Sequence, residues 1–334
     1  MATRVALALG SGGARGYAHI GVINELRARG YQVVGVAGSS MGALVGGLFA
    51  AGSLDEFTEW ANTLTQRTVL RLLDPSITAA GVFRAGKFLD AVRDILGEVT
   101  IESLPIPYTA VTTDLIAGKS VWLQRGPVDE AIRASIAIPG MIAPHVLDGR
   151  LLADGGILDP LPMAPIAAVN ADLTVAVSVS GMEPDLGSDE QTGGEPRATR
   201  ERLNRLLRST SALFDRFGTA AELPLDDEED EKEEDAEEAA QASTEDEELA
   251  EAVRETSIPK LGSFAVMSRT IDIAQAALAR HQMAAYPPDL LIEVPRTTCR
   301  SLDFHRAAEV INLGHELAST ALDRLEGGAA VPSQ

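Results

Sequence analysis

A serine between two glycines is the first feature of the sequence that could do chemistry. Residues 38–42 read Gly-Ser-Ser-Met-Gly and fit the G-x-S-x-G nucleophile elbow, with Ser40 as nucleophile and Gly38 and Gly42 at the ends. A sharp strand-to-helix turn holds such a serine in a strained backbone conformation, and the glycines remove Cβ clashes there. The hydroxyl then projects at a helix N-terminus, where the helix dipole favours developing negative charge. The alternative is a glycine-rich turn that merely packs tightly.

A second glycine-rich loop precedes the elbow. Residues 10–16 read Gly-Ser-Gly-Gly-Ala-Arg-Gly, follow a short apolar run and open a helical pattern. A dinucleotide-binding loop would have its third glycine where Arg15 stands, and the next strand lacks the acidic residue that would hold a ribose. The consecutive glycines Gly12 and Gly13 let backbone N–H groups point together at an anionic oxygen. We therefore predict an oxyanion hole in this loop.

A serine nucleophile needs a base, and the sequence offers a carboxylate rather than a histidine. In an α/β-hydrolase several strands precede the elbow and a histidine follows the acid, whereas a single strand precedes the elbow here. Asp154 stands at the end of a short apolar run, and Gly155 and Gly156 behind it would allow close approach. The alternative is an ordinary Asp-Gly turn. His281 and His315 lie within helical patterns and are weaker candidates for a base.

The elements that must position these residues alternate between strand and helix, which is typical of a parallel sheet covered by helices. Strands are predicted at residues 4–9, 33–37, 108–113, 120–123, 151–153, 173–179 and 290–294. Helices are predicted at residues 14–29, 41–51, around 54–73, 87–96, 128–135, 262–285 and 304–325. Both glycine loops then leave the carboxyl ends of neighbouring parallel strands, where sites collect in open α/β sheets.

Charge separates one segment from the rest of the chain. The formal net charge is −21, and residues 222–251 hold 17 Asp or Glu and one Lys, so most of the acidity belongs to this acidic tract. The tract has almost no large apolar residues and cannot bury enough surface to offset chain entropy, so we expect disorder. Phosphate contacts require a basic surface, and we therefore expect no nucleic-acid partner.

A different pattern precedes the acidic tract. In residues 197–217 leucines and phenylalanines share one helical face and arginines the other. This basic amphipathic helix could lie on an anionic membrane surface, or it could pack on the domain and expose its arginines to water. We expect residues 183–257 to be an insertion in one domain formed by 1–182 and 258–326, followed by a flexible tail at 327–334.

Compartment and cofactors follow from absences in the sequence. The single cysteine, Cys299, excludes an intramolecular disulfide and fits a reducing compartment. The first apolar run is too short for a secretory signal. We expect a cytoplasmic protein. If residues 197–217 lie on a membrane rather than on the domain, the protein would contact the inner face of the membrane peripherally through them. The sequence shows no cluster of His, Asp and Glu with metal-ligand spacing, so we expect no metal and no cofactor.

Taken together, these motifs resemble those of the patatin-like phospholipases, serine acyl hydrolases that include bacterial lipid esterases and the catalytic domain of neuropathy target esterase. The resemblance depends on residues 12–16, 38–42 and 154–156 in that order. Residues 113–115 with Gly118, 134–140 and 159–162 support it. It extends from residue 4 to about 182 and from 261 to about 325. It implies a three-layer α/β/α fold with a mostly parallel central sheet and helices on both faces.

The resemblance also implies roles for single residues. Ser40 and Asp154 would form a Ser–Asp dyad that cleaves a lipid or fatty-acyl ester through an acyl-enzyme. The amides of Gly12 and Gly13 would form the oxyanion hole, and Arg15 would help to shape its loop. The glycines that complete the motifs are Gly16, Gly38, Gly42, Gly155 and Gly156. Plant members begin the first glycine loop with Asp-Gly, whereas residues 10–11 of this chain are Gly-Ser.

Other functions compete with hydrolysis. An alcohol or thiol can resolve the same acyl-enzyme instead of water, which would make the protein an acyltransferase. A non-hydrolytic regulator or scaffold could keep the fold, but the intact Ser40, Asp154 and glycine loop argue against it. A nucleotide-binding function is disfavoured because Arg15 stands where the third glycine of a dinucleotide-binding loop would be. Labelling of Ser40 by a serine-reactive fluorophosphonate would separate the two enzymes from the other functions.

Deletion of the acidic tract, residues 222–251, tests the role of the insertion. We expect the deletion to leave the hydrolysis rate of a soluble ester unchanged and to strengthen binding to anionic vesicles in a salt-sensitive way. The reason is that the tract would otherwise neutralise the arginines of residues 197–217. The measurements are the ester rate and vesicle binding at low and high salt. A deletion variant that unfolds, or whose vesicle binding is unchanged, would contradict this role.

Overall fold

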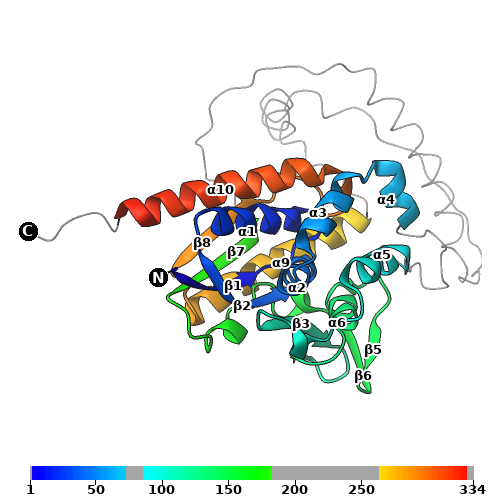
Figure 1. The fold of residues 1–334 in the computed structure, drawn as a ribbon. Helices are drawn as coiled ribbons and strands as arrows, with labels where there is room; N and C mark the ends of the chain where they lie inside the picture. Colours follow the sequence, from blue (N-terminus) through cyan, green and yellow to red (C-terminus); the bar gives the residue numbers. More distant parts are fainter. Residues whose placement is uncertain (1, 73–85, 182–262, 329–334) are drawn as a thin grey trace, which may run out of the picture. The chain divides into compact units, whose positions relative to one another are not determined.

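A computed structural model describes residues 2–72, 86–181 and 263–328, which belong to one compact unit. In this part of the chain eight strands form one sheet of order β5-β6-β3-β2-β1-β7-β8, with β4 paired to β3 (Figure 1). The strands are β1 (Arg4–Leu9), β2 (Gln32–Ser39), β3 (Tyr108–Asp114), β4 (Lys119–Leu123), β5 (His145–Leu147), β6 (Arg150–Asp154), β7 (Leu173–Gly181) and β8 (Leu290–Pro295). The predicted insertion at 183–257 and residues 329–334 of the predicted tail lie outside the described residues. The tail was predicted to begin at residue 327, but residues 327–328 still belong to the last helix, because its backbone hydrogen bonds continue through them.

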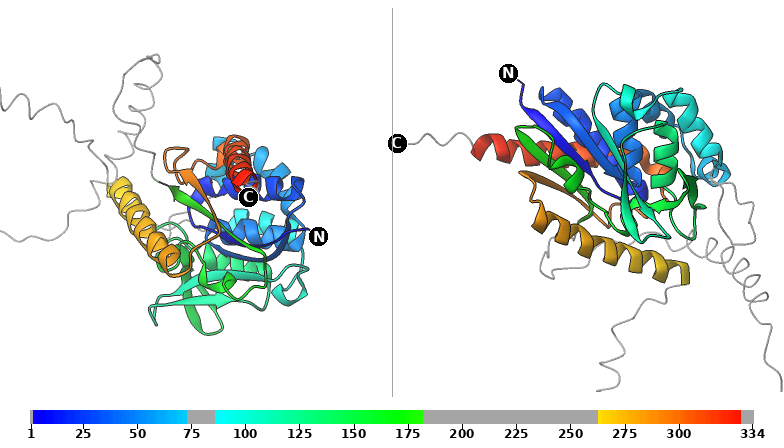
Figure 2. Two further views of the ribbon diagram at one scale, coloured as in Figure 1. Left: turned by 90° about the vertical axis from the view of Figure 1, so that its left-hand side faces the viewer. Right: turned by 90° about the horizontal axis from the view of Figure 1, so that it is seen from below.

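Helices cover both faces of this sheet. The α-helices are α1 (Ala18–Ala28), α2 (Met41–Ala51), α3 (Leu54–Asn62), α4 (Gln66–Leu72), α5 (Gly86–Leu96), α6 (Val128–Ser135), α9 (Ser263–Ala285) and α10 (Ala307–Gly328). The 3-10 helices are η1 (Gly13–Tyr17), η2 (Ile101–Ser103), η3 (Gly155–Ile157), η4 (Ala164–Ile166) and η6 (Phe304–Arg306). α1, α2 and α10 pack on one face, while α9 and η4 pack on the other (Figure 2).

The pairing of the strands confirms the predicted fold class. β1 pairs in parallel with β2 and β7, β2 with β3, and β7 with β8. Antiparallel pairs occur among β3, β4, β5 and β6. The sheet is therefore mostly parallel and lies between two helical layers, as in a three-layer α/β/α fold.

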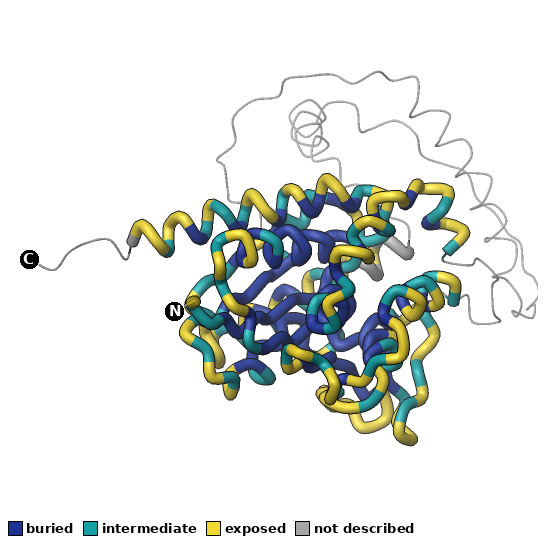
Figure 3. Tube along the Cα trace, viewed as in Figure 1, coloured by how far each residue is buried: buried dark blue, intermediate teal, exposed yellow. Residues whose placement is uncertain are grey.

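Alternating side chains on the central strands explain the two layers. In β1, Val5, Leu7 and Leu9 point into the larger core with α1, α2 and α10. Ala6 and Ala8 point to the other face, into a smaller core beneath α9 and η4. Because successive residues of a strand face opposite sides, a run of apolar residues predicts a strand buried on both faces. The same strands are buried along their length in Figure 3, and the outer side of α10 is exposed.

Three local structures differ from the sequence prediction. The helical pattern around residues 54–73 is interrupted, because Thr63 donates its hydroxyl to a carbonyl of α3 at 2.7 Å and Thr65 accepts an N–H of α4 at 3.2 Å. The helix predicted at 14–29 begins as η1 before α1 starts. In addition, the three-residue strand β5 was too short for its pattern to mark it.

Glycines allow α2 to approach the sheet at the elbow. A Cβ atom on Gly42 would lie 2.1 Å from the carbonyl oxygen of Leu9, and one on Gly38 would lie 2.2 Å from the carbonyl oxygen of Gly42. Both contacts are with backbone atoms, which no side-chain rotation could relieve. The flanking glycines of the elbow are therefore required by close approach.

Replacement of Gly42 by alanine is expected to destabilise the fold by about 2 kcal/mol or more, because the backbone of β1 must move to admit the new methyl group. Gly86→Ala is the matched control, since no atom lies within 4 Å of a Cβ placed at Gly86. Urea denaturation measures the free energy of unfolding of both variants. Equal midpoints for Gly42→Ala and the wild type would contradict the close approach.

Candidate active site

Two strand ends meet on one side of β3. β2 pairs with the first half of β3 and ends with Ser39 opposite Val111. β6 pairs with the second half and ends with Asp154 opposite Thr112. β4 pairs with both halves of β3 from its other side, so β2 and β6 share the remaining side. The residue that follows β2, Ser40, therefore meets the last residue of β6.

Ser40 stands at a sharp turn between β2 and α2. Its φ is 56° and its ψ is −121°, in the left-handed half of backbone space that residues with a Cβ atom seldom adopt. Such a conformation costs on the order of 1–3 kcal/mol and persists where the surroundings impose it. The side chain is only 3% exposed. This turn between a strand and a helix is the context that a nucleophile elbow requires.

The hydroxyl of Ser40 donates a hydrogen bond to Asp154, with 2.5 Å between Oγ and Oδ2. The other carboxylate oxygen of Asp154 accepts the N–H of Gly156 at 2.7 Å. Asp154 is 3% exposed, and burial raises its pKa to about 6, although the bonds from Ser40 and Gly156 act in the opposite direction. A higher pKa makes the carboxylate a stronger base, so it is better able to take a proton from a hydroxyl.

The first glycine loop lies after β1, the strand next to β2. Within the described residues no acceptor is found for the N–H groups of Gly12 and Gly13, whereas Ser11 and Ala14 on either side donate to backbone carbonyls at 2.8 and 2.9 Å. Gly13 also lines the pocket that contains Ser40. Two adjacent N–H groups without acceptors beside a buried hydroxyl are what an oxyanion site needs.

Arg15 holds this loop through contacts that the sequence could not indicate. Its Nε donates to the carbonyl oxygen of Gly12 at 3.3 Å, and its Nη2 pairs with the carboxylate of Asp272 on α9 at 2.9 Å. Nη2 also lies 3.4 Å from the hydroxyl of Ser301. The side chain of Arg15 is buried. Its ion pair with Asp272 ties the loop to α9, which packs on the other face of the sheet from α1 and α2. Asp272 is 257 positions away in the chain, and no motif marks it.

The histidines make other contacts. His19 is fully buried and lies 2.8 Å from the carbonyl oxygen of Gly10, and burial lowers its pKa to about 4. His145 and His315 each pair with a glutamate. In the part of the chain that the structure describes, no histidine is hydrogen-bonded to Ser40.

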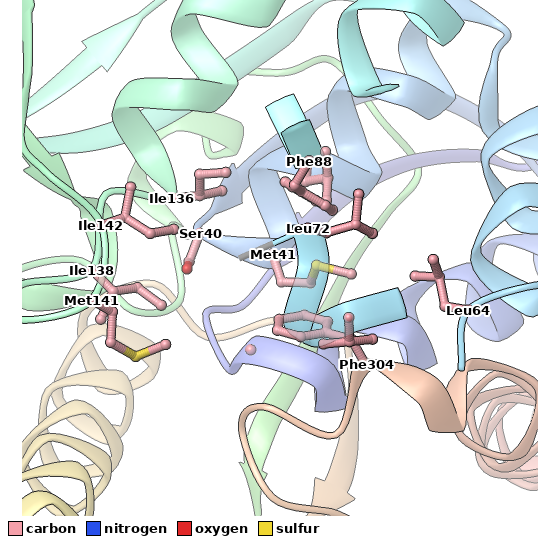
Figure 4. Close-up of a pocket in the computed structure, with 13 residues that line it drawn as sticks. Ser40, Met41, Leu64, Leu72, Phe88, Ile136, Ile138, Met141, Ile142 and Phe304 are labelled. Carbon is pink, nitrogen blue, oxygen red and sulfur yellow. The ribbon is translucent and has the colours of Figure 1, made fainter. Parts of the chain in front are cut away.

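An apolar pocket opens beside Ser40 (Figure 4). It encloses about 650 Å³ of space, part of it open to solvent. Its lining residues come from both glycine-containing loops, α2, the segment 64–72, α5, the segment after α6, and η6. They are Gly13, Ser40, Met41, Leu44, Leu64, Val69, Leu72, Phe88, Ile136, Ile138, Met141, Ile142 and Phe304. Apart from the serine hydroxyl, no polar side chain is among them, so the pocket fits an alkyl chain.

Contacts between aromatic rings support one wall of the pocket. Phe304 packs edge to face on Tyr17, with ring centres 6.1 Å apart, and Tyr17 lies 6.4 Å from Phe57. Phe57 contacts Trp60, which contacts Phe88 at 5.9 Å. The chain of rings thus begins and ends at pocket residues. The wall therefore includes η6 and α5, which are far apart in the sequence.

Within residues 2–72, 86–181 and 263–328, no group of three or more His, Cys, Asp or Glu side chains could hold a metal ion. Over the same residues, no helix is long and apolar enough to cross a membrane.

Known proteins match the chain over different lengths. The sequence family described as patatin-like phospholipase matches residues 7–167. An NTE family protein of Mycobacterium tuberculosis is 67% identical over 338 residues, covering 97% of this chain and 92% of that protein. Neuropathy target esterase sws of Drosophila melanogaster is 33% identical over 186 residues, 54% of this chain and 13% of that protein. The structure of VipD from Legionella pneumophila aligns at 14% identity with a TM-score of 0.43, over 96% of this chain and 67% of that one.

Asp154→Asn is expected to stabilise the protein at neutral pH. The pKa of Asp154 is about 6 in the folded protein, against an ordinary value of 3.8 in the unfolded chain. The protein therefore loses stability as the pH rises through this window, because the folded state binds the proton more tightly. At pH 8 this corresponds to about 3 kcal/mol. Asparagine keeps an oxygen for Gly156 and can donate to Ser40, so the variant avoids that cost.

Denaturation by urea at pH 8 and pH 4 measures this effect. The variant should exceed the wild type in free energy of unfolding at pH 8, and the difference should shrink toward pH 4. A variant that is less stable than the wild type at pH 8 would contradict the desolvation of Asp154.

Proposed function

The chain belongs to the patatin-like phospholipase family, as its motifs predict, and from this premise we propose that it is a serine acyl hydrolase that cleaves carboxylic esters of lipids. One observation carries the proposal: a buried serine hydroxyl donates to a buried carboxylate at the wall of an apolar pocket. The name of the family, patatin-like phospholipase, and that of the relative neuropathy target esterase agree with this chemistry.

The proposed reaction begins with attack by Ser40. Its Oγ bonds to the ester carbonyl carbon while its proton passes to Oδ2 of Asp154, and the carbonyl oxygen becomes an oxyanion. The N–H groups of Gly12 and Gly13 would hold that oxyanion, and one such donor contributes on the order of 3 kcal/mol to transition-state stability. Collapse breaks the bond to the alkoxide, which takes the proton from Asp154 and leaves an acyl ester on Ser40.

Hydrolysis of the acyl-enzyme completes the proposed cycle. A water molecule attacks the acyl carbon and gives a proton to Asp154, and the second collapse returns that proton to Ser40 and releases the fatty acid. The apolar pocket would hold the acyl chain throughout. Each methylene group removed from water adds about 0.8 kcal/mol of binding, so the pocket favours long chains over short ones.

Ser40→Ala and Asp154→Asn are each expected to lower the rate by at least about 1,000-fold, because each removes a group that reacts. Asp159→Asn is the matched control for the carboxylate. Asp159 is also largely buried, with its pKa raised to about 6, but it bonds to Gln282 and not to Ser40. The assays are hydrolysis of p-nitrophenyl esters and of lysophospholipids. Near-normal turnover by Asp154→Asn would refute the dyad.

The pH dependence of kcat/KM offers a separate test. Asp154 must be unprotonated to accept the proton of Ser40, and its pKa is raised to about 6. The rate should therefore be level above pH 7 and should fall about tenfold per unit well below pH 6. Asp159→Asn should keep this profile. A profile that stays level down to pH 4.5 would contradict Asp154 as the base.

A further inference from the structure

The strained turn at Ser40 needs a partner that holds it, and one buried side chain bonds to it directly. The N–H of Ser40 donates to the hydroxyl oxygen of Ser135, at 2.9 Å. The hydroxyl of Ser135 in turn donates to the carbonyl oxygen of Val111, at 2.6 Å. Ser135 is the last residue of α6 and is 0% exposed, so water does not compete for these bonds.

The direction of the two bonds is fixed by the number of protons. A serine hydroxyl has one proton and two lone pairs, so when it donates to Val111 it can accept from Ser40. Val111 is the residue of β3 that pairs with Ser39. The hydroxyl of Ser135 therefore joins the N–H of the nucleophile to the strand that sets the position of the elbow.

The same segment also bonds to the backbone of Asp154. The N–H of Asp154 donates to the carbonyl oxygen of Ala137, two residues beyond Ser135, at 2.9 Å. Ile136 and Ile138, which alternate with these residues, line the pocket. Residues 135–137, at the end of α6 and just beyond it, thus contact both members of the dyad through one hydroxyl and one backbone carbonyl.

We propose that Ser135 is a positioning residue for the nucleophile, which holds Ser40 in the backbone conformation that aims its hydroxyl at Asp154. This inference rests on the proposed hydrolase function. Without the hydroxyl, the buried N–H of Ser40 has no partner, and the turn is free to relax toward ordinary backbone angles. The Oγ of Ser40 then leaves the line between Asp154 and the ester carbon. Ser135 itself touches neither the substrate nor the transferred proton.

Ser135→Ala tests the proposal with a soluble p-nitrophenyl ester. We expect kcat to fall about 10- to 100-fold with KM within about twofold, since misplacement by about 1 Å costs that much in rate and leaves the apolar pocket intact. The midpoint of the kcat/KM profile should also move above that of the wild type, because the bond from Ser40 lowers the pKa of Asp154. If Ser135 contributed to stability alone, its loss would change neither kcat per folded molecule nor the midpoint of the kcat/KM profile.

Two variants make the result specific. Ser135→Thr keeps the hydroxyl and should recover most of kcat, whereas Ser178→Ala, which removes a buried hydroxyl from β7, should match the wild type. Each rate is divided by the fraction of the protein that is folded at the assay temperature, which a thermal unfolding curve of that variant gives. If the wild type hydrolyses no ester and is not labelled by fluorophosphonate, the proposed function has failed. If the wild type is active and Ser135→Ala equals it in kcat and pH midpoint, the positioning role is overturned.

Discussion

The register of β2, β4 and β6 on β3 is the constraint on which the whole site depends. β4 occupies one side of β3, so β2 and β6 meet end to end on the other, with Ser39 opposite Val111 and Asp154 opposite Thr112. A slip of β6 by one residue would turn Asp154 to the opposite face of the sheet and move it by about 3.3 Å. The contact between nucleophile and carboxylate is therefore set by backbone hydrogen bonds, which vary less than side-chain rotamers.

Around that register the fold holds two features that are unfavourable by themselves. Ser40 has a positive φ, and Asp154 is a buried carboxyl with its pKa raised to about 6. Strain and desolvation of this kind persist where a rigid scaffold imposes them, and they are concentrated at functional sites. Here the scaffold is the packed sheet, with glycines at the elbow that allow α2 to touch β1. The same burial that costs stability makes the carboxylate more basic.

Local sequence patterns were sufficient for the features that depend on neighbouring residues. The elbow, the glycine loop and Asp154 with its two glycines each lie in a short motif, and the apolar runs of β1 and β2 each lead into a glycine-containing turn. The family followed from these motifs together, whereas the order of the strands came from the structure.

The features that the sequence did not indicate depend on contacts between distant residues. Asp272 pairs with Arg15 across 257 positions, and Ser135 bonds to Ser40 across 95. No motif marks Asp272, and residues 134–140 support the family resemblance without indicating that Ser135 bonds to Ser40. Phe304 reaches the pocket from η6 because the sheet and its helices bring the two ends of the chain together. Such contacts arise from tertiary packing, which periodicity and motif spacing do not encode.

The central claim is that Asp154 activates Ser40 directly, and the rate of covalent labelling tests it most directly. A fluorophosphonate is mixed with the wild type and with Asp154→Asn at pH 8, and the labelled peptide is identified by mass spectrometry. The account predicts a single label on Ser40 in the wild type and a rate at least about 100-fold lower in the variant. A label on another residue, or equal rates for both proteins, would contradict it.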